Sequence, residues 1–156
     1  RLLRGTRPRP SGMLQSDPEG CIIGFSHAAT DLMAQRARLT AGLFGQFLSE
    51  FAEFKPIGLA KIACATSKGG REHPWFSVHE VGPDRIDGTL ENEPFDIPGL
   101  RKGERYTRPL EDLTDWMIML PMGSINPRHM SLASMVRQNP DKAREVLAML
   151  RAMPQE

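Results

Sequence analysis

Residues able to do chemistry gather between positions 72 and 116 of this 156-residue chain. Glu72 and His73 stand next to each other, and a carboxylate beside an imidazole can tune a general base. Neighbouring residues on a strand point to opposite faces, however, so the two side chains are poorly placed to hydrogen-bond to each other. The pattern therefore favours a polar strand entry that supports Trp75 over a catalytic pair.

The histidines and cysteines do not have the spacing of a metal site. His73 and His79 share strand parity but would lie about 20 Å apart at roughly 3.3 Å per residue. Cys21 and Cys64 are 43 positions apart and form no C-x-x-C pair, which is typical of a reduced compartment. Cys64 lies in an apolar run and is expected to be a buried small hydrophobe. No phosphate loop is present either, so the sequence predicts neither a metal nor a cofactor.

Two short motifs combine polar groups with turn or anchor residues. In Asn92-Glu93-Pro94, the asparagine side chain can hydrogen-bond its own downstream backbone and set a turn. In Asp115-Trp116, the carboxylate can accept backbone N–H groups while the indole anchors a core. Both motifs favour a structural role, and a binding role gains weight if they line one cleft.

Charge is distributed unevenly although the formal net charge is only +1. The segment 72–96, here called the acidic ribbon, holds seven acids against Arg85 alone, a local balance of −6. Such a ribbon is usually a solvated surface, but it can also meet a basic partner. Basic residues lie in positions 1–10 and 101–108, where Tyr106 is the one aromatic residue, so a pattern of interleaved aromatics that stack on bases is lacking and nucleic acid ranks last as a partner. The candidate binding residues are Glu80, Asp84, Asp87, Glu91, Asn92, Glu93, Asp115 and Trp116.

A long helix over residues 28–54 is the first element that the pattern predicts. Ser26 or Thr30 can cap its start, and Pro56 and Gly58 follow its end. Apolar residues recur at three- and four-residue spacing and should form one stripe. The stripe consists of Leu32, Met33, Leu39, Leu43, Phe44, Phe47, Leu48, Phe51 and Phe54.

Strand patterns follow the helix. Residues 57–66, 75–81 and 85–92 read as strands separated by turn signals, and a last strand is expected at 104–108 or 116–120. Sequential strands joined by short turns pair antiparallel. The fold class is therefore α+β, with the long N-terminal helix packed on a four- to five-stranded antiparallel sheet and helices at the C-terminal end.

The ends of the chain differ from this middle part. Residues 1–19 read as an irregular basic tail, residues 20–125 as the α+β domain and residues 126–156 as a helical extension. The short apolar run 21–23 fits either a strand or a packed turn. Ser131 can cap a short helix, and Asn139-Pro140 begins another with a stripe of Ala143, Val146, Leu147 and Leu150.

Composition sets the broad class of the protein. Hydrophobic residues make up 40% and charged residues 25% of the chain, as in ordinary globular domains. No apolar run approaches the roughly 18–20 residues that cross a bilayer. These features predict a cytoplasmic protein without a membrane partner. Because the chain begins at Arg1, a removed signal segment remains open, and so does the oligomeric state.

The order of several motifs resembles the YegJ-like family of uncharacterised bacterial proteins. The resemblance covers roughly residues 28–122. It rests on a leading helix, then Glu72-His73-Pro74-Trp75, then 88–94 with Gly-x-Leu-x-Asn-Glu-Pro, Gly103 and Asp115-Trp116-Met117. It implies a fold and an order of elements. It implies no catalytic residue.

Two classes of function remain open at this stage. The first is a non-enzymatic protein-interaction module, accessory or toxin-neutralising, that meets a basic protein through the acidic ribbon. The second is a small hydrolase or transferase with His73 or His129 as base, oriented by Asp115 or Glu93. The sequence does not decide whether catalysis occurs.

Overall fold

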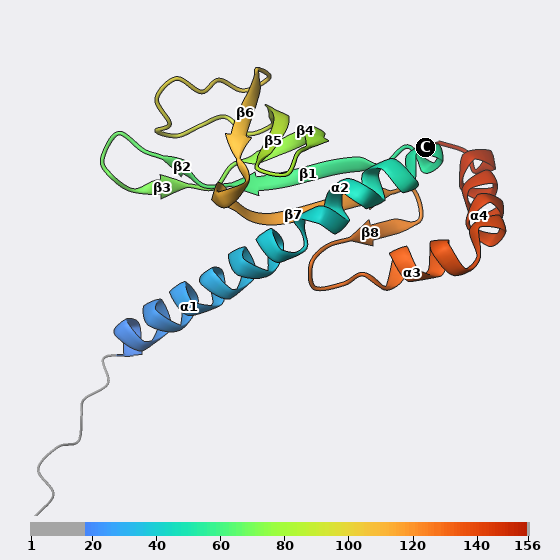
Figure 1. The fold of residues 1–156 in the computed structure, drawn as a ribbon, viewed down its shortest axis with the longest axis horizontal. Coiled ribbons are helices and arrows are strands. Elements are labelled where there is room, and N and C mark those ends of the chain that lie inside the picture. Colours follow the sequence, from blue (N-terminus) through green and yellow to red (C-terminus); the bar gives the residue numbers. More distant parts are fainter. Residues whose placement is uncertain (1–17, 156) are drawn as a thin grey trace, which may run out of the picture.

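The computed structural model describes residues 18–155, with side chains from residue 28 onward. Two helices come first, then a mainly β region, then two further helices (Figure 1). The predicted tail lies almost entirely outside the described residues. The elements are α1 Pro18–Leu39, α2 Ala41–Glu50, the 3-10 helix η1 Ala52–Phe54, β1 Ile57–Ile62, β2 Cys64–Ala65, β3 Arg71–Glu72, β4 Trp75–Val81, β5 Arg85–Leu90, β6 Arg105–Pro109, the 3-10 helix η2 Leu110–Asp112, β7 Leu113–Leu120, β8 Gly123–Ile125, α3 Ser131–Gln138 and α4 Pro140–Ala152.

The prediction of one long helix over 28–54 is wrong, because the helix breaks at Thr40. The Thr40 hydroxyl donates to the carbonyl oxygens of Arg36, at 2.7 Å, and Ala37, at 3.3 Å. A threonine that bonds back to the preceding turn bends a helix. The same hydroxyl oxygen accepts from the indole N–H of Trp116 at 3.0 Å, which fixes the break against β7. Helix α1 also begins earlier than predicted and includes the run 21–23, which is neither strand nor turn.

The sheet of the described residues has six strands rather than four to five. Its order is β6-β5-β4-β1-β7-β8 and every pairing is antiparallel. Both alternatives for the last strand are present, as β6 and β7, and β8 adds an edge strand. The predicted strand 57–66 ends at Ile62, where the pairing with β7 shifts, and Cys64–Ala65 pairs with β3 in a separate ribbon.

Helices α1 and α2 pack on one face of the sheet (Figure 1). Phe44 stacks on Trp116, with ring centroids 4.9 Å apart and an interplanar angle of 9°. Gly58 allows α2 to pack closely on this face, since a Cβ there would lie 2.9 Å from the Leu48 side chain, and a Cβ at Gly88 would lie 2.8 Å from the Ser77 carbonyl oxygen of the neighbouring strand. This face holds the hydrophobic core.

The predicted apolar stripe holds in α2 but not in α1. Leu32 is 66% exposed and Leu39 79% exposed, whereas α1 buries Ala34 and Ala37. Small side chains let the helix axis approach β7 closely, so the large residues point elsewhere. A spacing rule that counts large apolar residues therefore selects the wrong side of α1.

The C-terminal helices dock on the same chain. Asn139 caps α4 by accepting the Lys142 backbone N–H at 3.1 Å, as its sequence predicts. Arg137 of α3 donates two hydrogen bonds to Glu50, and Arg144 of α4 donates two to Glu53. These pairs attach both helices to the end of α2 and to η1.

Candidate binding surface

The face of the sheet opposite α1 and α2 carries an apolar centre. Ile57 is 54% exposed and Met119 is 45% exposed, and they lie opposite each other on β1 and β7. Leu59 lies between Ser77 and Met117 in the same register. We call this surface the open face; it consists of Ile57, Leu59, Lys61, Trp75, Ser77, His79, Glu80, Asp87, Thr89, Glu91, Met117 and Met119.

A groove of about 550 Å³ lies at the middle of the open face. Trp75 is half-buried in its wall, and the ammonium group of Lys61 lies 5.7 Å from the centre of the indole ring. Glu91 supplies the one charged side chain among the groove residues. The full lining is Ile57, Leu59, Trp75, Ser77, Glu91 and Met117. Apolar walls with one carboxylate suit an apolar side chain next to a basic one.

A bulge in β4 adds a second carboxylate to this face. The pairing with β5 shifts between Val78 and Glu80, so that Glu80 lies opposite Asp87. His79 stays on the same face and its Nε2 atom lies 2.8 Å from the Thr89 hydroxyl. Two residues on the bulged strand thus oppose one on the partner. Strict alternation would have placed Glu80 toward the core and Val81 toward solvent, and the structure has the reverse.

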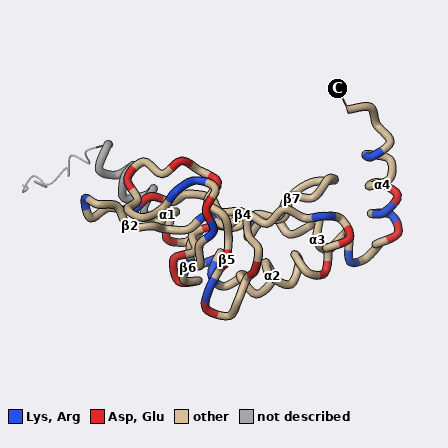
Figure 2. Tube along the Cα trace, turned by 90° about the horizontal axis from the view of Figure 1, so that it is seen from above, with Lys and Arg blue, Asp and Glu red and all other residues tan. Residues whose placement is uncertain are grey.

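Asp87 is the one acid of the open face with a close cationic partner from β6. Arg105 donates to both carboxylate oxygens of Asp87, and the Nε bond measures 2.8 Å. These hydrogen bonds lower the pKa of Asp87 and raise the pKa of Arg105. The pair therefore leaves Glu80 and Glu91 as the carboxylates of this face that are free to meet an external cation. Figure 2 shows charged residues gathered near β5 and β6, whereas β4 and β7 run through a largely uncharged middle.

The acidic ribbon does not form one surface. Asp84 lies in the β4–β5 turn beside Arg38 and Pro109, away from the open face. Glu93 lies exposed in the loop after β5. Glu72 accepts the backbone N–H groups of Phe95, at 3.1 Å, and Asp96, at 2.5 Å, and so anchors that loop. The sheet thus separates acids that are neighbours in sequence.

Asn92 and Asp115 are held in structural hydrogen bonds. The Asn92 side chain accepts the Trp75 backbone N–H at 2.7 Å and ties the end of β5 to the start of β4. Asp115 is 7% exposed; it accepts the Trp116 backbone N–H at 2.9 Å and two hydrogen bonds from Arg128. Asp115 lies opposite Lys61 on the same face of the sheet, but both of its carboxylate oxygens are bound to Arg128.

Trp116 lies in the core between the sheet and α2. Its side chain is fully buried and stacks on Phe44, and its N–H group bonds to Thr40. The two predicted motifs therefore do not line one cleft: Asn92 ends a strand at the open face, and Trp116 packs on the opposite side.

The rival acid–base site has a different arrangement from the one that the sequence suggested. Thr114 lies next to His73, with its hydroxyl oxygen 3.4 Å from the imidazole Nδ1 atom. That hydroxyl also donates to the Lys61 carbonyl at 3.1 Å, so a hydrogen bond between the hydroxyl and the imidazole requires Nδ1 as the donor. A polar cavity of about 370 Å³ adjoins this pair and is also lined by Arg38, Arg71 and Asp112. His129 pairs through its backbone with Asn126, and Asp115 is bound to Arg128.

Lowering the pH is expected to weaken folding through His73. Desolvation, followed by the charges of Lys61 and Arg71, lowers the pKa of His73 from its ordinary value of 6.5. The unfolded chain then takes up the proton first, so the contribution is complete above pH 6.5 and is lost as the pH falls through the lower folded-state pKa. Unfolding midpoints of wild type and His73→Gln between about pH 8 and pH 5 check this, since the variant should show a flatter profile. Identical profiles would contradict it.

The described residues contain neither a metal-binding cluster nor a membrane-spanning helix. No three histidine, cysteine, aspartate or glutamate side chains of this part of the chain are grouped as a metal site requires. Among the described helices, none combines the length and apolarity needed to cross a membrane. Cys64 is buried and free, and burial raises the pKa of its thiol.

Comparison with known proteins identifies the family. A family model described as an uncharacterized protein conserved in bacteria, DUF2314, matches residues 31–130. The chain belongs to this family. No curated protein and no solved structure matches it. The resemblance drawn from the sequence is thereby confirmed as far as an uncharacterised bacterial family, and the YegJ-like name is not.

The DUF2314 match spans the whole sheet and therefore the whole open face. It ends at Met130, immediately before α3, so the two C-terminal helices lie beyond it. Sequence reasoning missed the apolar part of the open face, which comprises Ile57, Leu59, Trp75, Met117 and Met119. The sequence did indicate this surface, because β1 and β7 have apolar residues at both odd and even positions. A strand with one solvated face normally alternates between apolar and polar residues.

Proposed function

We propose that this DUF2314 domain is a non-enzymatic protein-interaction module whose open face binds a protein partner with an apolar anchor and a basic rim. The observation that carries the proposal is the groove at Trp75, where an apolar patch meets the carboxylate of Glu91, with Glu80 further along the same face. Contiguous apolar surface rimmed by polar residues is typical of protein-binding sites.

Charge complementarity supports a basic partner over an acidic one. The charged residues of the open face are Glu80, Asp87 and Glu91 against Lys61, with Arg105 of β6 bound to Asp87. Lys61 lies over the indole of Trp75 from β1, and Glu91 lies next to Trp75 on the other side, where its backbone N–H bonds to the Trp75 carbonyl. Opposite charges steer encounter and exclude acidic surfaces. An accessory or toxin-neutralising role is one form of this proposal.

The test compares two charge-reversed variants of the acidic ribbon. One carries Glu80→Lys and Glu91→Lys on the open face, and the matched control carries Asp84→Lys and Glu93→Lys outside it, with the same change in net charge. We expect a basic protein to be captured from a lysate of the host bacterium by wild type and control, and lost by the open-face variant and at high salt. Equal capture by all three proteins would overturn the proposal.

A further inference from the structure

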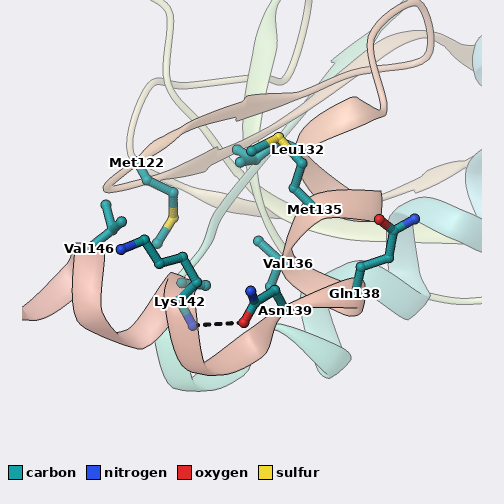
Figure 3. Close-up of a pocket in the computed structure, with 9 residues that line it drawn as sticks. Met122, Leu132, Met135, Val136, Gln138, Asn139, Lys142 and Val146 are labelled. Atoms are coloured by element: carbon teal, nitrogen blue, oxygen red, sulfur yellow. Dashed lines mark hydrogen bonds between the residues drawn. The ribbon is translucent and has the colours of Figure 1, made fainter.

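The helical pair beyond the DUF2314 match borders a further cavity, which is partly open to solvent, since Met135 in its lining is 64% exposed. It has a volume of about 410 Å³ and lies between α3, α4 and the turn that joins β7 to β8. Figure 3 shows the Met122 side chain extending between Val146 of α4 and Val136 of α3. The apolar lining consists of Met122, Leu132, Met135, Val136, Ala143 and Val146.

The two helices that line the cavity are also bound to the rest of the domain. An apolar gap in a protein normally closes by repacking. Here Arg137 makes a bidentate ion pair with Glu50 at the end of α2. Arg144 makes a bidentate ion pair with Glu53 in η1. Ala143 adds only a methyl group at the point where α4 faces α3, which leaves the space unfilled.

The cavity is also lined by a few polar residues, of which one is charged. Gln138 and Asn139 are amides, and Lys142 is the cation. The Lys142 ammonium group lies beside Val146 in Figure 3 and pairs with Glu145 at 3.0 Å. Both side chains of that pair are 64% exposed, and an exposed pair of this kind contributes little, so the lysine is free to turn to another anion.

We propose that this cavity binds a linear aliphatic carboxylate, with the chain against the methionines and the carboxylate at Lys142. A cavity of about 410 Å³ holds on the order of ten carbon atoms, at roughly 30 Å³ for a water-sized group. Methionine side chains adapt to flexible apolar ligands better than branched ones do. The proposal commits to the free acid in solution, and it does not depend on the open face.

Methyl NMR of the methionines tests the proposal directly. Decanoate, used below its micelle concentration, is titrated into the full chain with the methyl groups of Met122 and Met135 as reporters. Met117 and Met119 on the open face serve as internal controls. We expect saturable shifts at the two cavity methionines only, and weaker binding of decanol and of decyltrimethylammonium. The absence of shifts, or equal binding of all three compounds, would overturn the proposal.

A charge change at the rim gives a second readout. Lys142→Glu should weaken decanoate binding about tenfold or more, because a hydrogen bond to a charged group contributes roughly 1.5–3 kcal/mol. Lys142→Arg should retain binding, and Lys102→Glu, with the same change in net charge at a distant loop, should leave it unchanged. Equal loss in both glutamate variants would show a bulk charge effect and refute the site. Co-sedimentation with phosphatidylglycerol vesicles, without decanoate binding, would likewise refute it in favour of a bilayer.

Discussion

Replacing Trp116 by alanine is expected to lower the free energy of unfolding by about 3–5 kcal/mol, the range for large aromatic truncations in a core. The indole is fully buried and stacks on Phe44. Its removal leaves a cavity between β7 and α2, and it also removes the hydrogen bond that fixes the helix break at Thr40. Since whole domains are stable by only about 5–15 kcal/mol, this is a large fraction of the total.

The other tryptophan provides the matched control. Trp75 is half-buried at the open face, so Trp75→Ala should change the unfolding free energy by about 1 kcal/mol or less. Each variant keeps one tryptophan, and urea unfolding followed by the remaining indole measures both. Equal destabilisation by the two changes would contradict the assignment of one indole to the core and the other to a binding surface.

Replacing Arg128 by methionine is expected to cost about 2–3 kcal/mol. Arg128 donates to both oxygens of Asp115, at 3.3 and 3.2 Å, and the carboxylate has little contact with solvent. Removing one partner of a fully buried ion pair costs about 3–5 kcal/mol because a charge is left unpaired. The loss here is smaller since the arginine side chain is 35% exposed.

A second change at the same pair separates charge from packing. Asp115→Asn keeps an oxygen for the Trp116 backbone N–H but removes the charge. The double variant Asp115→Asn, Arg128→Met should therefore be more stable than Arg128→Met alone. A double variant of equal or lower stability would indicate that Lys61, which lies across the strand pair from Asp115, already neutralises the carboxylate.

The sequence was most informative where local pattern and tertiary packing agree. The α+β class, the antiparallel pairing and the cap of α4 at Asn139 follow from alternation, short turns and side-chain chemistry. The helix break did not, since Thr40 is an acceptable helix residue until Trp116, 76 positions away, donates to its hydroxyl. The buried side of α1 also depends on how closely β7 approaches.

The sequence predicted the candidate site as one continuous segment, whereas in the structure the candidate surface is a face of the sheet to which several strands contribute. Glu80, Asp87 and Glu91 do reach one surface, but Asp84 and Glu93 leave it at a turn and a loop. Whether Glu80 points to solvent or to the core depends on a bulge, and no residue type in β4 predicts that bulge. Apart from Trp75, the apolar part of the surface comes from β1 and β7, which are far apart in the sequence and neighbours in the sheet.

The bulge at His79 and Glu80 also bears on how the length of this chain can vary. In a regular strand, loss of one residue turns every later side chain to the other face. If His79 were deleted, the remaining residues of β4 would alternate without interruption. The residues toward the helices would be Phe76, Val78 and Val81, and the outward residues would be Trp75, Ser77 and Glu80. The middle of this strand is therefore a place where the domain can shorten by one residue and keep both of its surfaces.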